Sequence, residues 1–213
     1  MINKFLDRLI LALVAILLLN ACNEQSRKDS SHSTEKDANK MARRSADTIV
    51  TTYIDDFENF KNAIYKQDVT KMKTFFDFPL RADTTQIWEA IYDNMDQGKR
   101  PETIPVTFTS EDFEKNHKYL FNDAFVQSLQ KIDGKQLYEQ GEFTTAKTST
   151  QDQSFYMLAH FDNSIRSLQL SLMYSGWKDE NGEEMSEGES AIIFFFKVTT
   201  TNHLVFDKVL FAG

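Results

Sequence analysis

A chain of 213 residues is long enough for one domain with accessory segments, and a hydrophobic content of 41% excludes a largely disordered protein. The formal net charge of −8 is unevenly distributed: residues 1–21 carry +1, residues 22–46 carry +2, and residues 47–213 therefore carry −11. So acidic a main segment argues against nucleic acid as a partner, because phosphates would repel it, and against close docking on anionic lipid.

The first residues have the pattern of an export signal. Lys4 and Arg8 form a basic start, and an unbroken apolar run follows from Leu9 to Leu19. These 11 residues match the central region of a signal peptide. A membrane-spanning helix would need about 20 apolar residues. We therefore expect residues 1–21 to be a signal peptide that is removed.

The apolar run ends in Leu19-Asn20-Ala21-Cys22, which resembles the lipobox of bacterial lipoproteins. Leu19, Ala21 and Cys22 fit that pattern, whereas Asn20 is larger than the residue usual at its position. The resemblance implies that Cys22 carries a thioether-linked diacylglycerol and that its new amino group is acylated. Cys22 is also the chain's only cysteine, and lipidation would leave no free thiol in an oxidising compartment.

An acylated Cys22 would make membrane lipid a partner of this chain and would place it in the cell envelope, at the outer membrane in a Gram-negative cell. Two or three acyl chains anchor a protein stably, because each buried CH₂ contributes about 0.8 kcal/mol. Residues 22–46 are mostly polar and charged, so burial cannot offset the entropy of ordering them. We expect a disordered tether that carries a single domain, residues 47–213.

The first half of that domain has the apolar spacing of helices. Ile49, Tyr53, Phe57, Phe60 and Ile64 recur three and four residues apart. This spacing predicts a helix that starts at Asp47 or Thr48 and runs to about residue 66. Similar patterns predict a short helix after residue 68, a helical piece over 87–95 ended by a glycine at 98, and a long helix over about 110–132.

After Gly134 the apolar period changes to two, which predicts strands. The segment 191–196 is apolar at every position, so we expect a central strand covered on both sides, with helices as one cover and a partner subunit as one option for the other. Short turns favour antiparallel pairing, and helices followed by a sheet give an α+β fold. The four or five predicted strands span about residues 136–145, 154–161, 166–177, 189–200 and 202–212.

Three segments and the order of elements resemble the nuclear transport factor 2-like superfamily, in particular its lipoprotein domains of unknown function. The segments are Phe57-Glu-Asn-Phe-Lys-Asn-Ala63, Phe75-Phe-Asp-Phe-Pro-Leu80 and Phe206-Asp-Lys-Val-Leu-Phe-Ala-Gly213. The resemblance covers roughly residues 48–213. It implies a cystatin-like architecture, with helices in the concavity of a curved, mainly antiparallel sheet, and a homodimer through that sheet. It carries over no functional residue.

Three residues are candidates for lining a ligand pocket. His117 lies four residues from both Phe113 and Phe121, so it falls on the apolar face of the long helix and could act as an acid or base. The commoner role of such a histidine is burial against a backbone carbonyl or a tyrosine. Tyr174 and Trp177, near a strand end, could frame a ligand, although core or rim packing is the commoner role of such residues.

No other motif points to chemistry. His160 and His203 lie at strand positions outside any zinc-binding pattern. The acidic segment 179–189 fails the calcium-loop spacing and instead predicts a solvated hairpin, and residues 162–163 signal a turn. Asp55 and Asp56 fall on the polar side of the first predicted helix. We therefore expect no catalytic residue, no metal and no cofactor.

Three functions remain open. A non-catalytic binding or interaction module, with a protein or small molecule as its partner, fits the lack of catalytic motifs best. The alternatives are a small-molecule enzyme that uses a cavity between helices and sheet, and a structural protein of the cell envelope. Whether that cavity is open or filled distinguishes the binding module from the enzyme. The 18 phenylalanines of the chain predict that it is filled or narrow.

Overall fold

The computed structural model describes residues 50–151, 153–176 and 189–213 of the chain. The expected signal peptide, Cys22 and the tether lie outside these residues, as do Trp177 and most of the acidic hairpin segment. In the described part of the chain, no helix has both the length and the apolar character that crossing a bilayer requires.

The first described helix, α3 (Tyr53–Tyr65), begins at a capping box. The Thr52 hydroxyl accepts the Asp55 backbone N–H, and the Asp55 carboxylate accepts the Thr52 backbone N–H at 2.7 Å. The predicted caps, Asp47 and Thr48, lie outside the described residues, and the helix begins later than predicted.

Short elements follow α3. Asp68 caps α4 (Val69–Lys73), and α5 (Ile87–Asp93) ends before the glycine predicted to stop it. Two short strands, β1 (Leu80–Arg81) and β2 (Thr107–Phe108), pair with each other and form a separate small sheet. Single 3-10 turns, η1 and η2, occupy residues Ala82–Thr84 and Gln97–Lys99.

The prediction of one continuous helix over residues 110–132 is wrong. The segment forms two helices, α6 (Ser110–Leu120) and α7 (Asp123–Gln130). The break occurs because the Asn122 side chain accepts the Phe125 backbone N–H at 2.9 Å and starts a new helix. The apolar residues keep the same spacing across the break, so the pattern alone predicts a single helix.

The first predicted strand, 136–145, is also mostly wrong. Asp133 caps a helix, α8 (Gly134–Gln140), and only β3 (Glu142–Thr144) is a strand. Gly141 separates the two with a φ of 76°, a left-handed conformation that ends helices and that glycine adopts without strain.

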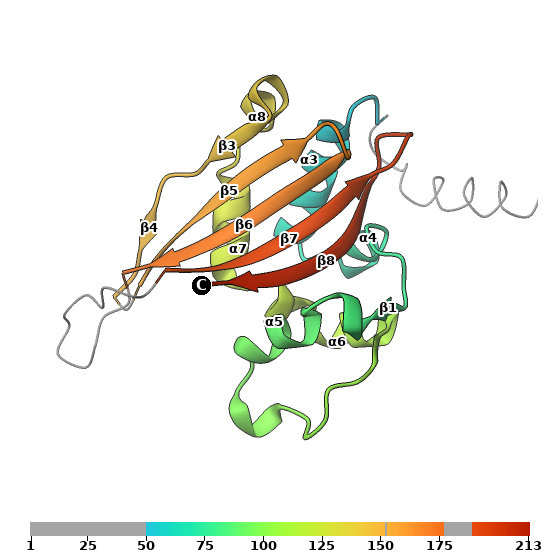
Figure 1. Ribbon diagram of the computed structural model, residues 1–213, viewed down its shortest axis with the longest axis vertical. Coiled ribbons are helices and arrows are strands. Elements are labelled where there is room, and N and C mark those ends of the chain that lie inside the picture. The colour runs from blue at the N-terminus through green and yellow to red at the C-terminus, as the bar shows by residue number, and fades with distance from the viewer. Residues whose placement is uncertain (1–49, 152, 177–188) are drawn as a thin grey trace, which may run out of the picture. The chain divides into compact units, whose positions relative to one another are not determined.

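The main sheet has the strand order β3-β5-β6-β7-β8, with β4 (Thr148–Ser149) also paired to β5, and every pairing is antiparallel. The predicted α+β class is confirmed, since the helices precede most of the sheet (Figure 1). β7 lies between β6 and β8, as predicted for an inner strand. The four long strands are β5 (Ser154–Asp162), β6 (Ser167–Ser175), β7 (Ser190–Val198) and β8 (Leu204–Ala212).

The helices cover one face of this sheet, and α3 and α7 cross behind the strands in Figure 1. The space between helices and sheet is filled by aromatic rings, as predicted. The Phe60 ring centroid lies 5.2 Å from that of Phe75, 5.8 Å from that of Phe121 and 5.0 Å from that of Phe196. On the opposite face Ile193 and Phe195 stay half-exposed, so the described residues cover β7 fully on one side only.

Candidate functional site

One end of the sheet carries a polar surface pocket of about 490 Å³. It lies where the start of α3, the end of α8, the β5–β6 turn and the β7–β8 turn meet. We call it the Arg166 pocket, and its principal lining residues are Thr51, Tyr53, Tyr138, Phe161, Arg166 and Asn202.

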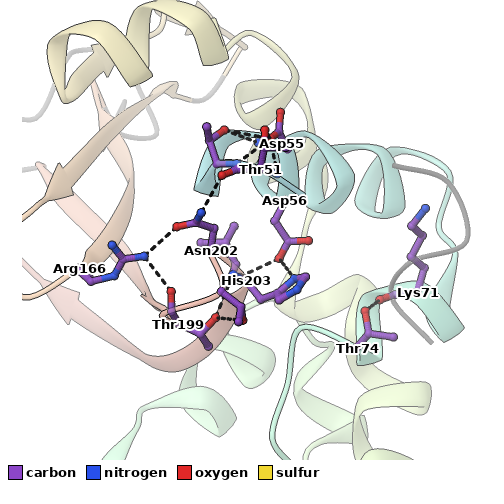
Figure 2. Close-up of polar contacts among 12 residues, drawn as sticks. Thr51, Asp55, Asp56, Lys71, Thr74, Arg166, Thr199, Asn202 and His203 are labelled. Atoms are coloured by element: carbon purple, nitrogen blue, oxygen red, sulfur yellow. Dashed lines mark hydrogen bonds and ion pairs between the residues drawn. The ribbon is translucent and has the colours of Figure 1, made fainter. Parts of the chain in front are cut away.

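Arg166 ties two hairpin turns together. Its Nε donates to the Val198 carbonyl at 3.2 Å, and its Nη2 donates to the Thr199 carbonyl at 2.8 Å and to Asn202 Oδ1 at 2.9 Å (Figure 2). Asn202 Nδ2 in turn donates to the Thr51 carbonyl at 2.8 Å. The β5–β6 turn, the β7–β8 turn and the chain entering α3 therefore form one rigid rim.

This rim is set locally by the turn residues. Arg166 and Asn202 have φ values of 50° and 63°, the left-handed conformation that tight turns require and that asparagine tolerates well. At the start of α3, the hydroxyl of Thr51 donates to the Asp55 carboxylate at 2.7 Å. That bond, with the backbone N–H of Thr52, holds the pKa of Asp55 below its usual range.

Stacked aromatic rings form the wall of the pocket. Tyr53 and Phe161 stack with ring centroids 3.9 Å apart and planes inclined by 19°, and Tyr138 lies 5.8 Å from Tyr53 at 45°. Tyr53 is 7% exposed, and its buried hydroxyl has no hydrogen-bond partner within the described residues. Burial, and to a lesser extent the nearby Tyr138, raises the pKa of Tyr53 to about 12.

A buried Asp–His pair lies beside the rim. Asp56, 1% exposed, accepts the Leu204 backbone N–H at 2.8 Å, and His203 Nδ1 lies 3.5 Å from the same carboxylate oxygen (Figure 2). The imidazole is thus within ion-pairing reach when protonated, but it is not aligned for a hydrogen bond. The expectation that Asp56 falls on the polar side of its helix is wrong, because this face of α3 packs on the start of β8.

The groups that line the pocket can contact a ligand through hydrogen bonds and ring faces. His203 and Asp56 do not line the Arg166 pocket, so they cannot reach a ligand there. Among the residues that the structure describes, no three His, Cys, Asp or Glu side chains converge as metal ligands would. What the pocket offers is hydrogen-bonding groups beside an aromatic wall.

No family model, curated protein or solved structure matches this chain. The role of the pocket must therefore follow from its own residues.

The candidates predicted from sequence lie elsewhere. His117 on α6 contacts the Glu114 carbonyl through Nδ1 at 3.0 Å, as its alternative role required, but the side chain is only half-buried. The Tyr174 hydroxyl, on the helix side of β6, accepts from Asn122 Nδ2 at 3.2 Å. Burial raises the pKa of Tyr174 in spite of that bond. Trp177 lies outside the described residues, so the three do not form a described pocket.

Sequence patterns give little indication of the Arg166 pocket. They do predict a polar turn at Asp162, and its carboxylate accepts the Ser164 backbone N–H at 2.8 Å. The pairing of that turn with the β7–β8 turn depends on strand order, which a single sequence does not show. Asn202, in a run of threonines, is the one available turn signal there.

A second hollow of about 500 Å³ lies beside the small β1–β2 sheet. Its walls include Ile104 and Val106, which are exposed, with Arg81 and Asp83 at its edge. The two charged side chains pair with each other, so neither is held ready for a ligand. The Arg166 pocket is the better candidate, because a hydrogen-bonded rim fixes its shape.

Proposed function

We propose that this chain is a lipid-anchored binding module of the cell envelope, and that its ligand site is the Arg166 pocket. Acylation of Cys22, expected from its lipobox, would hold it on the membrane, and the tether of residues 22–46 would give the domain reach. The domain itself would recognise a ligand without transforming it.

The proposal that the domain binds its ligand without transforming it rests on the packing between the helices and the sheet. An enzyme that used this space would need an open cavity with convergent ionisable groups. Instead the rings of Phe60, Phe121 and Phe194 meet there, and Phe121 lies 5.9 Å from Phe194. A ligand therefore has to bind at the surface, which favours a binding module over the enzyme alternative.

We also propose that the domain has the architecture of the nuclear transport factor 2-like superfamily, which the sequence resembles. Helices occupy one face of an antiparallel sheet, and β8 has one extra residue, Asp207, opposite the Phe195–Phe196 step of β7, a bulge of the kind that curves a sheet. The third alternative, a structural envelope protein, differs from a binding module in needing no defined pocket.

The anchor is tested by metabolic labelling with radioactive palmitate. Wild-type protein should be labelled and should sediment with membranes, whereas Cys22→Ser should be unlabelled, because Cys22 is the chain's only thiol. Ser26→Ala is the matched control, since it changes a nearby tether residue, keeps the thiol and should be labelled like wild type. Unlabelled wild-type protein that retains residues 1–21 would refute the anchor.

The binding role is tested by photo-crosslinking in intact cells. A benzophenone amino acid replaces Tyr138, which is 53% exposed in the pocket, or Tyr65, which is 66% exposed on α3 and outside it. Position 138 should give an adduct that position 65 does not give. Identical products from the two positions, or none from either, would contradict a ligand site at this pocket.

A further inference from the structure

We infer that the ligand of the Arg166 pocket is a saccharide. This inference rests on the proposed function, and it adds the chemical class that the pocket selects. Three properties of the pocket support it: its ring faces, the free donors and acceptors on its rim, and its balance of charge.

The ring faces suit the C–H face of a sugar. Tyr138 is half-exposed and inclined by 45° to the buried Tyr53, and Phe161 stacks on Tyr53 at 19°. Tyr53 thus contacts both of the other rings. A pyranose presents one apolar face of C–H groups, which packs on such rings while its hydroxyls point sideways.

The rim supplies hydrogen-bonding groups that have no protein partner. Within the described residues, the Asn163 side-chain amide makes no hydrogen bond, and the Nη1 of Arg166 likewise has none. Asn163 is exposed, whereas Arg166 is held in place by its other nitrogens. A ligand with several hydroxyl groups could satisfy donors and acceptors of both kinds.

The charges exclude other classes of ligand. Arg166 and Glu139 are the one cation and the one anion of the described lining. A single balanced pair, in a domain that is acidic overall, gives no cluster of positive charge for phosphates or nucleotides. Thr51, Gln140 and Asn202 make the remaining wall polar, which disfavours a hydrocarbon.

The size of the pocket agrees with a small saccharide. Its volume of about 490 Å³ lies within the range of ordinary small-molecule sites. The hydrogen bonds from Arg166 to Thr199 and Asn202 keep the rim preformed, so that binding a sugar would order few side chains.

The test is isothermal titration calorimetry on the full chain, purified in a detergent that has no sugar headgroup. The probes are cellobiose, N,N′-diacetylchitobiose and digalacturonic acid, with tetraalanine as a peptide. At least one saccharide should bind, and Tyr138→Ala and Asn163→Ala should each weaken it about tenfold or more. Both side chains are exposed, so neither substitution should unfold the domain.

Tyr65→Ala is the matched control, because it removes an exposed tyrosine outside the pocket and should leave the affinity unchanged. Saccharide binding that survives both pocket substitutions would overturn the inference. Binding of tetraalanine but of none of the saccharides would also overturn it. The absence of binding by all four probes would do the same. If the sugars fail while Tyr138 still gives a position-specific crosslink in cells, the ligand class is wrong and the binding module stands. If the crosslink fails too, the proposed function falls with it.

Discussion

Asp56 is a buried carboxylate whose contacts join α3 to the start of β8. Replacing it by alanine would leave the Leu204 N–H without its acceptor and His203 without its neighbouring carboxylate. Losing a buried polar partner of this kind costs about 1–3 kcal/mol. We expect Asp56→Ala to lower the free energy of unfolding by about 2 kcal/mol or more, measured by urea denaturation.

Asp207→Ala is the control for that substitution. Asp207 pairs with Lys197 on the exposed face of the sheet, and such surface pairs contribute about 0–1 kcal/mol. Equal losses in the two variants would show that the buried carboxylate does not stabilise the fold.

Tyr53 makes stability depend on pH in the alkaline range. Its folded pKa of about 12 lies above the ordinary tyrosine value of about 10. The folded state therefore favours the neutral phenol. This contribution is fully present below the unfolded pKa and is lost as the pH rises through the folded one.

Tyr53→Phe should consequently lose less stability than wild type between pH values of about 10 and about 12, measured by urea denaturation across that range. Near neutral pH it should cost little, because the hydroxyl has no partner among the described groups. Parallel stability curves would show that Tyr53 does not titrate as its burial implies.

At the scale of elements, side-chain caps decide where the sequence prediction fails. β5, β6 and β8 were predictable because one face of each is buried, as the period-two pattern requires, and β7 was predictable from its unbroken apolar run. The break at Asn122 and the helix α8 depend instead on single side chains that accept backbone N–H groups. Such local bonds leave the apolar spacing almost unchanged.

The candidate site is still harder to predict. Arg166, Asn202 and Tyr138 come from three separate segments that only the strand order brings together. His117, chosen for its apolar spacing, instead contacts a carbonyl of its own helix. Periodicity identifies buried faces, but it does not indicate which turns meet at the end of a sheet.

β7 provides the test at this scale. Phe196 is fully buried, with ring centroids 5.0 Å from Phe60 and 5.7 Å from Phe206. Phe196→Ala should cost about 3–5 kcal/mol, since the cavity would be enclosed by other rings. Phe211→Ala, at the exposed end of β8, should cost about 1 kcal/mol or less. Thermal unfolding monitored by circular dichroism compares them, and similar shifts would contradict the packing described.

At the scale of the whole molecule, the feature left to explain is the sheet face that the described residues leave uncovered. Leu158, Ile193 and Leu210 lie in one row that crosses the four strands β5 to β8, with Ser171 between the first two, and all three hydrophobic side chains are half-exposed. Apolar surface in so regular an array is typical of protein interfaces. A second copy of the chain, one option that the sequence analysis left open, would cover it.

We therefore predict that the protein is a dimer in solution and that Ile193→Lys makes it monomeric. The substitution places a charge at the centre of the row, where burial without a partner costs several kcal/mol. The dimer should weaken at least about 100-fold, as measured by sedimentation equilibrium. Leu158→Lys should act in the same way, whereas Tyr65→Lys, on an exposed part of α3, should leave the dimer intact. A monomeric wild type, or dimers in all three variants, would mean that this face serves another partner.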